Sequence, residues 1–382
     1  MTELLLGPWA KSFPASSWGM TQREFLESKP HLAAFATPLL TLDAAAMANN
    51  VALMAQWVGQ RNLHIAPHGK TTMAPQLWKQ VLDAGAWGIT LATAWQVQFA
   101  RSMGINRILL ANELIDPVAL RWLGVELADP SFEFVCWVDS VEAVELMRTG
   151  LAGAARPVDV LVELGGERGR TGARGVQQAL TVAAAIDAAP ELRLVGVGGY
   201  EGSLARARTP EGIATVERYL DDIVAVHDAV QWGQRPILSA GGSAWFDLVA
   251  AKLGPLVGGA TVILRSGAYQ VHDDGFYRGI TPQPGFRSAM HGWARVLSRP
   301  EPGLAILDGG KRDFAYDEGI PVSEFGIIDK LNDQHAYLRS DAVEVGDVVR
   351  LGLSHPCTAL DKWRLIPVLD GDEVVDLVRT YF

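Results

Sequence analysis

Residues 158–197 read VDVLVELGGERGRTGARGVQQALTVAAAIDAAPELRLVGV, and this stretch decides the expected fold. A largely apolar run at Val158–Glu163 is followed by a glycine-rich loop, a helical stretch at Val176–Ala188 and a second apolar run at Leu192–Val197. Continuously apolar runs are typical of parallel strands that are buried on both faces. The stretch therefore predicts one strand–helix–strand unit of a parallel sheet.

The same order of elements repeats on both sides of this unit. Further strands are expected at His64–Ala66, Gly88–Leu91, Arg107–Ala111, Glu133–Val138, Pro236–Ser239 and Thr261–Leu264, and further helices at Ala94–Met103, Val141–Thr149 and Gly212–Val230. Asp139 and Ser140 stand where an N-cap belongs before one of these helices. Eight strands that alternate with helices predict an α/β fold with a (β/α)8 barrel. A doubly wound sheet is the alternative, because alternation alone does not distinguish the two.

The pattern changes after about residue 270, where runs such as GLAILDGG and WRLIPVLDG alternate with turns and predict a mainly β domain. A strand at Thr37–Asp43 and a helix at Ala44–Val58 precede the repeats, and this strand could pair with the later β domain. We expect residues 1–35 to pack on the β domain, residues 36–270 to form the barrel, and residues 271–382 to form the C-terminal β domain.

Composition excludes several classes of protein. The chain has 382 residues and a net charge of -10 without a basic cluster, which argues against nucleic acid as the main partner. Two cysteines exclude a disulfide framework and favour a cytoplasmic location. The N-terminus lacks the features of a signal peptide, and no apolar run reaches the roughly 18–20 residues that cross a membrane.

Two groups of residues after barrel strands suggest cofactor chemistry. Lys70 follows the first barrel strand, at the end of the barrel that carries active sites, and a desolvated amine there suits a Schiff base. Gly241 and Gly242 follow another strand and precede a helix, where backbone amides suit a phosphate. A surface lysine and an ordinary glycine turn are the respective alternatives.

His355 and Cys357 form a possible metal pair. On an extended segment, side chains two residues apart point the same way, and imidazole and thiolate are good zinc ligands. Two protein ligands would leave positions open for water or substrate, as in a catalytic site. A purely structural role of the pair is the alternative.

Other polar side chains also follow predicted strands. Arg170 lies in the glycine-rich loop and could place a cation beside a ring nitrogen or a carboxylate. Tyr200, Tyr269 and His272 could be hydrogen-bonding or stacking groups, or could serve only in packing. Since all follow barrel strands, we expect them to converge on one rim.

The motifs PHGKTTMAP, LANE, GRTG, YEGS, AGGS, RSGAY and SHPC occur in this order between about residues 35 and 370. Together they resemble those of the D-threonine aldolase and D-serine dehydratase family. The resemblance implies an alanine-racemase-like fold, in which a pyridoxal 5'-phosphate (PLP) barrel is followed by a β domain, and it implies a homodimer.

The resemblance also implies a role for each candidate residue. PLP would be attached to Lys70, its phosphate held by Gly241, Gly242 and Ser243, its pyridine nitrogen faced by Arg170, and its ring contacted by Tyr200, with Tyr269 as a further cofactor residue. His355 and Cys357 would bind a divalent metal. The His-x-Cys pair looks like the zinc site of the dehydratases, whereas the aldolases tend to have aspartate second and to use manganese. Thr72 replaces a second histidine of many members, so His68 could supply the general base.

These features predict a lyase that acts on small β-hydroxy D-amino acids with PLP and a divalent metal. Lys70 would take the Cα proton and the metal would activate the β-hydroxyl, giving a 2-oxo acid and ammonia. Retro-aldol cleavage to glycine and an aldehyde is the alternative, and Cys357 favours the dehydratase. A racemase fits less well because two-base chemistry needs no metal pair. A non-catalytic PLP carrier is the alternative from another class.

Overall fold

The computed structural model describes residues 5–382, which fall into two units. Unit 1 contains the chain up to Met54, Thr71–Gln80 and Ala268–Phe382, and unit 2 contains Ala55–Lys70 and Val81–Gly267. The first four residues of the expected N-terminal segment lie outside the described residues. The expected boundaries after residues 35 and 270 stay predictions.

Unit 2 is built on a sheet of parallel strands. Their order is β2 (His64–Ile65), β10 (Thr261–Leu264), β9 (Ile237–Ala240), β8 (Leu192–Gly199), β6 (Val158–Gly165), β5 (Glu133–Val138), β4 (Arg107–Glu113) and β3 (Ile89–Leu91), with the short β7 (Ala173–Arg174) beside β6. A parallel bridge between His68 and Thr90 joins the segment after β2 to β3, so the sheet closes on itself. The predicted barrel is confirmed, and the doubly wound alternative was wrong.

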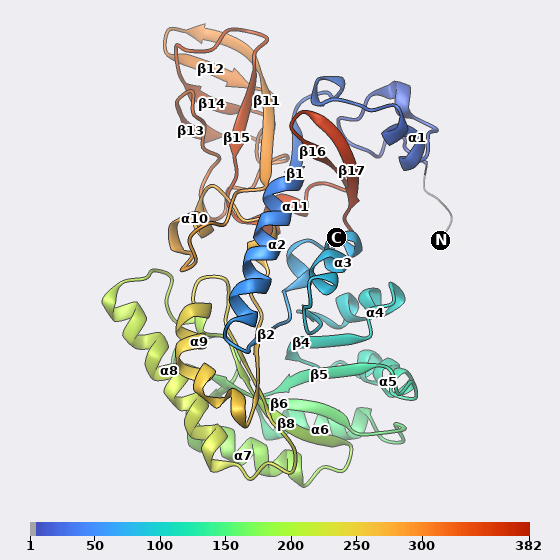
Figure 1. The fold of residues 1–382 in the computed structure, drawn as a ribbon, viewed down its shortest axis with the longest axis vertical. Coiled ribbons are helices and arrows are strands. Elements are labelled where there is room, and N and C mark those ends of the chain that lie inside the picture. Colours follow the sequence, from blue (N-terminus) through green and yellow to red (C-terminus); the bar gives the residue numbers. More distant parts are fainter. Residues whose placement is uncertain (1–4) are drawn as a thin grey trace. The chain divides into compact units, whose positions relative to one another are not determined.

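Helices lie on the outer side of these strands (Figure 1). They are α4 (Ala94–Ser102), α5 (Pro117–Glu126), α6 (Val141–Gly150), α7 (Val176–Asp187), α8 (Pro210–Ala229) and α9 (Phe246–Leu253), while α3 (Pro75–Asp83) spans the boundary between the units. Ser140 caps α6, because its side chain accepts a hydrogen bond from the amide of Ala143. Asp139 is not the cap, since its carboxylate accepts the amide of Gly172 instead.

The barrel interior is apolar at its centre and polar where the strands end. Leu109, Ala111, Val135, Trp137, Leu161 and Val195 form a buried cluster. Because side chains alternate along a strand, Glu163 faces the same side as Leu161, and Glu113 lies close to Glu163. The carboxyl ends of the strands therefore carry polar groups inside the barrel.

Unit 1 contains a mainly antiparallel sheet. Its strand order is β13 (Ile327–Leu331), β14 (Ala336–Arg339), β12 (Leu304–Leu307), β11 (Met290–Glu301), β1 (Leu39–Asp43), β16 (Leu365–Asp370) and β17 (Glu373–Arg379), and β15 (Val348–Gly352) pairs with β11. The predicted strand at Thr37–Asp43 does pair with the later β strands, because β1 lies between β11 and β16. Phe13, Phe25 and Phe35 join the core of this sheet.

Short helices complete unit 1: α1 (Gln22–Glu27), most of α2 (Ala44–Gly59), α10 (Phe276–Ile280) and α11 (Pro356–Leu360). A capping box between Thr21 and Glu24 starts α1. The helix α11 has proline at its first position, which the fixed φ of proline favours. This five-residue helix carries Cys357 and is the element on which the metal pair depends.

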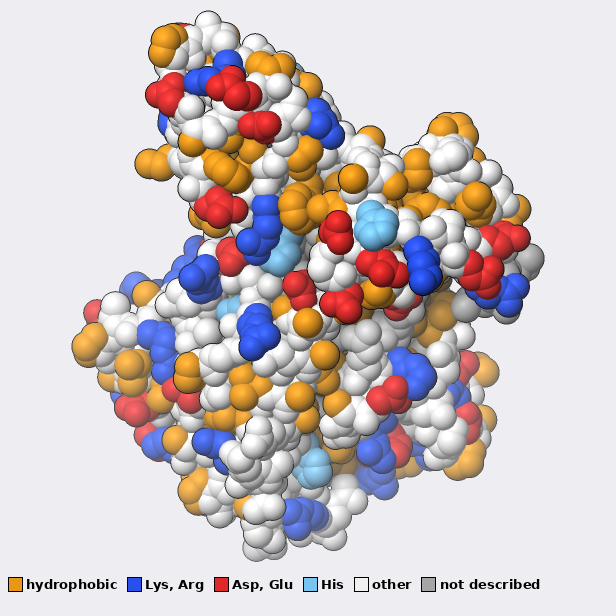
Figure 2. Space-filling view, turned by 45° about the horizontal axis from the view of Figure 1, so that its top comes forward, with side chains coloured by type: hydrophobic (Ala, Val, Ile, Leu, Met, Phe, Trp, Pro, Cys, Tyr) orange, Lys and Arg blue, Asp and Glu red, His pale blue; other side chains and the backbone are white. Residues whose placement is uncertain are grey.

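The distribution of charged side chains on the surface agrees with the net negative charge of the sequence. Among the described residues on the face drawn in Figure 2, Lys and Arg stand singly or in small groups between Asp and Glu. Clustered cations of the kind that bind nucleic acid are not seen on that face. Among residues 5–382, none of the helices combines the length and apolar character needed to span a bilayer.

Candidate functional site

Lys70 and His68 lie directly after the first barrel strand. Lys70 is in a single 3-10 turn, η3 (Gly69–Thr71). The Nδ1 atom of His68 is buried and has no hydrogen-bond partner among the described residues. Burial, and then the charges of Lys70, Arg265 and Arg170, lower the pKa of His68 well below its usual value. His68 is therefore an uncharged polar group beside positive charges.

Arg170, Tyr200 and the glycine loop come together at the strand ends. The guanidinium carbon of Arg170 lies 5.0 Å from the centre of the Tyr200 ring. A Cβ added to Gly242 would lie 2.8 Å from the Tyr200 ring atom Cε2, so only glycine allows the loop to approach the ring so closely. Three predicted cofactor residues from separate loops therefore share one place in unit 2.

Glu201 engages the amides that the sequence assigned to a phosphate. Its Oε2 accepts the amide of Gly241 at 3.1 Å, and its Oε1 accepts the amide of Gly242 at 2.5 Å. The residue is 0% exposed. Gly241 also has a φ of +95°, which glycine adopts without strain. The loop amides thus bind the carboxyl group of Glu201, a residue that was not predicted from the sequence.

Three carboxyl groups meet at the ends of β4, β5 and β6. Glu113, Asp139 and Glu163 are the only described group of three or more His, Cys, Asp or Glu whose ligand atoms all lie within 4.8 Å of one another. Burial, followed by the hydrogen bond and repulsion from Glu113, raises the pKa of Glu163 to about 9. The pair Glu113 and Glu163 therefore holds a proton at neutral pH.

This carboxyl cluster anchors the loop that carries Arg170. The hydroxyl of Thr171 donates to Glu163 Oε1 at 3.1 Å, and the amide of Gly172 donates to Asp139 Oδ2 at 3.1 Å. The cluster was not predicted from the sequence, because its members are far apart along the chain. The register of parallel strands was the signal that could have found it.

The barrel end fits a polar aromatic cofactor. His68 Nδ1 and Trp137 Nε1 are buried without partners among the described residues. Buried polar groups normally have a hydrogen-bond partner, so such atoms at one end of a barrel indicate a missing ligand. A lysine amine and an arginine over a tyrosine ring suit PLP, whereas the amides of Gly241 and Gly242 are occupied by Glu201 in this structure.

Tyr269 and His272 belong to unit 1. Tyr269 is buried and its ring centre lies 6.1 Å from that of Phe286. Burial lowers the pKa of His272 to about 4. Thr72, the departure from the family pattern, is also in unit 1 and is buried. The cofactor role of Tyr269 stays a prediction.

His355 and Cys357 do not lie on an extended segment, so that expectation was wrong. His355 has a left-handed backbone with φ 50° and is the N-cap residue of α11, and Cys357 lies inside that helix. The two side chains nevertheless interact. Their hydrogen bond, opposed by burial and reinforced by Asp317, raises the pKa of His355 to about 9.

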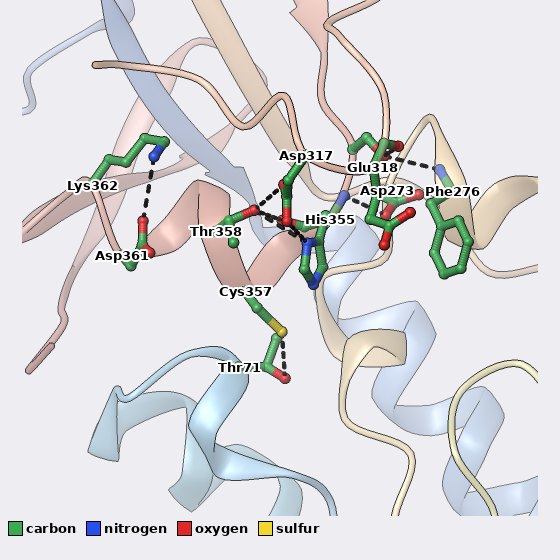
Figure 3. Close-up of polar contacts among 11 residues, drawn as sticks. Thr71, Asp273, Phe276, Asp317, Glu318, His355, Cys357, Thr358, Asp361 and Lys362 are labelled. Carbon is green, nitrogen blue, oxygen red and sulfur yellow. Dashed lines mark hydrogen bonds and ion pairs between the residues drawn. The ribbon is translucent and has the colours of Figure 1, made fainter. Parts of the chain in front are cut away.

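The donor atoms of this pair suit a divalent metal (Figure 3). His355 Nδ1 lies 2.6 Å from Asp317 Oδ2, so Nε2 is the nitrogen left for a ligand. Cys357 Sγ lies 3.4 Å from Thr71 Oγ1, and both residues are in unit 1. An imidazole nitrogen and a sulfur with few other protein ligands match a metal site that keeps open positions.

Comparison with known proteins identifies the family of the chain. Residues 42–251 match the family model of the alanine racemase N-terminal domain. The chain belongs to this family. Within the alanine racemase N-terminal domain family it carries a second match, over residues 289–369, to a model described as "Putative serine dehydratase domain". The resemblance to D-threonine aldolases and D-serine dehydratases, drawn from the motifs, is confirmed.

Two curated relatives cover most of the chain. A D-threonine aldolase of an Arthrobacter species is 28% identical over 85% of this chain and 86% of its own length. A D-threo-3-hydroxyaspartate dehydratase of a Delftia species is 28% identical over 74% of this chain and 73% of its own. The predicted enzyme class, a PLP-dependent lyase, is confirmed by these members.

Solved structures share the fold. A D-threonine aldolase from Filomicrobium marinum superposes with a TM-score of 0.81 at 24% identity, covering 91% of this chain and 95% of that chain. Structures of the D-threo-3-hydroxyaspartate dehydratase include a histidine-to-alanine variant and, two positions later in that protein, a cysteine-to-alanine variant in a metal-free form.

Proposed function

We propose that this PLP-dependent lyase is a metal-dependent dehydratase, which converts a small β-hydroxy D-amino acid into a 2-oxo acid and ammonia. The observation that carries the proposal is the pairing of His355 and Cys357, with the histidine ring held by Asp317. Such a donor pair favours zinc, and manganese is the alternative metal. Relatives in the same family act on β-hydroxy D-amino acids by name.

When bound, PLP supplies an electron sink at the substrate Cα, and a divalent metal supplies a Lewis acid for the β-hydroxyl. Lys70 would hold the cofactor and, once released, would be the base that takes the Cα proton. Arg170 would face the pyridine nitrogen and, as a permanent cation, would disfavour protonation of that nitrogen. A less protonated ring would be a weaker electron sink, so activation of the leaving hydroxyl would be more important. His68, kept neutral by burial, can accept a proton beside Lys70.

The relatives support a metal at this pair. The dehydratase of the Delftia species has been solved as variants of a histidine and of a cysteine two positions apart, the latter in a metal-free form. That spacing is the spacing of His355 and Cys357 here. By this correspondence both residues would be metal ligands, and the thiolate would favour the dehydratase reaction.

An aldolase is the second candidate, and the comparisons favour it directly. The Arthrobacter relative is named a D-threonine aldolase, and a Paracoccus denitrificans relative at 25% identity is named a 3-hydroxy-D-aspartate aldolase. In this reaction the β-hydroxyl loses its proton and the Cα–Cβ bond breaks. The same residues would serve, but the products would be glycine and an aldehyde.

One assay separates the candidates. Purified protein with PLP is incubated with D-threonine and either zinc or manganese, and the products are identified by mass. 2-Oxobutyrate and ammonia are expected, and glycine with acetaldehyde would instead establish the aldolase. Lys70→Ala, which removes the proposed base, is the control for enzyme-dependent product. A PLP absorbance band without turnover of any β-hydroxy D-amino acid would favour the carrier. The homodimer and the cytoplasmic location stay predictions.

A further inference from the structure

Polar contacts hold both the ring and the backbone of His355 in unit 1 (Figure 3). Asp317 Oδ2 lies 2.6 Å from the ring nitrogen Nδ1. The hydroxyl of Thr358 donates to the other oxygen of Asp317, Oδ1, at 2.6 Å. The backbone amide of His355 donates to Asp273 Oδ2 at 2.9 Å. Both the ring and the backbone of this histidine therefore have a carboxylate partner.

The contact with Asp317 decides which ring nitrogen can bind a metal. A carboxylate only accepts hydrogen bonds, so Nδ1 must carry the hydrogen. A metal binds only the neutral imidazole, which carries one hydrogen, and its lone pair is then at Nε2. Asp317 thus selects one tautomer of His355.

The backbone of His355 is held in a conformation that costs energy. A φ of 50° is unusual for a residue other than glycine and is strained. Asp273, which is buried, offsets this cost by accepting the amide of His355 together with the amides of Gly275 and Tyr277. Strain of this kind persists where the surrounding contacts fix a functional side chain.

We propose that Asp317 is a positioning residue for a divalent metal bound by His355 and Cys357. It holds the Nδ1–H of His355, presents Nε2 to the ion, and is itself oriented by Thr358. The inference rests on the proposed metal pair and adds a residue to it that lies 38 positions away in sequence. Carboxylates that hold the second nitrogen of a metal-bound histidine increase metal affinity about 10–100-fold.

The test is a titration of the full-length, PLP-loaded protein with cobalt in competition with a chromophoric chelator. Asp317→Ala is expected to weaken cobalt binding by about 10–100-fold while the protein stays folded by circular dichroism. At saturating cobalt the thiolate-to-cobalt absorption band should remain, because Cys357 still binds. Asp317→Asn, which keeps an acceptor oxygen, is expected to have an intermediate affinity.

Asp361→Ala is the matched control. Asp361 is a partly exposed carboxylate at the end of α11 that pairs with Lys362 at 3.7 Å rather than with His355. It should leave cobalt affinity within about twofold. Equal losses in both variants would reduce the effect to local charge and overturn the proposal. An Asp317→Ala variant that is folded and binds cobalt as tightly as the unmodified protein would also overturn it.

Three further variants distinguish failure of the positioning role from failure of the metal pair. If Asp317→Ala does not fold, Thr358→Val removes the brace on Asp317, and a loss of about threefold is expected; unchanged affinity would refute the positioning role. His355→Ala and Cys357→Ala test the pair itself. If both bind cobalt as tightly as the unmodified protein, the metal pair fails and the inference fails with it. If both lose cobalt while Asp317→Ala does not, only the role of Asp317 fails.

Discussion

Replacement of Glu163 by glutamine removes a proton that the folded barrel holds at neutral pH. Glu163 is 2% exposed and lies in the carboxyl cluster with Glu113 and Asp139. Burial first, and then Glu113, raises its pKa from 4.5 to about 9. Between these values the folded cofactor-free protein binds a proton that the unfolded chain has released.

The sign and size of the effect follow from this difference. Because the folded state binds more protons, the free energy of unfolding falls as pH rises. The stabilisation is fully present below pH 4.5 and is lost as pH rises toward about 9. One proton corresponds to a change on the order of 3 kcal/mol between pH 6 and pH 8. Glutamine cannot titrate, so Glu163→Gln should lack this part of the pH dependence.

The assay is urea unfolding of the PLP-free protein at pH 6, 7 and 8. The control is Glu167→Gln, which removes an exposed carboxylate from the same glycine-rich loop and should follow the unmodified protein. The difference in unfolding free energy between Glu163→Gln and the unmodified protein is expected to grow with pH in favour of the variant. Parallel pH profiles for the two would refute a protonated carboxyl group in the barrel.

Three further predictions concern the loop, the barrel and the metal. Gly242→Ala brings a methyl group within 2.8 Å of the Tyr200 ring and should weaken PLP binding by at least about tenfold in a fluorescence titration. The control Gly233→Ala, which places its methyl group in open space, should leave PLP binding unchanged. Tyr219→Phe removes a buried hydrogen bond of 2.6 Å to the carbonyl of Leu164 and should cost about 1–3 kcal/mol in urea unfolding. Chelation of the metal should abolish turnover but leave the PLP absorbance band, and loss of the band would contradict separate sites.

The strands were predictable because burial on both faces leaves a continuous apolar run. Glu133–Val138 and Thr261–Leu264 match β5 and β10 residue for residue, since polar residues end both runs. Helix α5 was missed although Asp116 and Pro117 give a standard start, with the aspartate accepting two amides. Its amphipathic pattern is short, and the apolar run of β4 just before it is a stronger signal than the helix.

The site residues were predictable only where a motif marks them. Lys70, Arg170 and Tyr200 stand in recognisable motifs, but Asp317 and Glu201 act through contacts that depend on tertiary structure. Asp317 lies in an irregular segment with no periodicity. Glu201 stands in the same YEGS motif as Tyr200, and the motif indicated a role only for the tyrosine. The predicted extended conformation of His355 and Cys357 was wrong, because a five-residue helix that begins with proline is too short to show helical periodicity in the sequence.

The interleaving of the two units has a consequence for how the chain is made. All residues of unit 2 lie before position 268, whereas unit 1 needs both the first 54 residues and the last 115. On a ribosome the barrel can close while β1 still lacks its partners β11 and β16, which are synthesised 247 or more residues later. Strand β1 therefore stays unpaired until β11 and β16 have been synthesised, and such non-local pairing is slow. Truncation near the C-terminus should therefore leave a folded barrel with an exposed, aggregation-prone N-terminal strand.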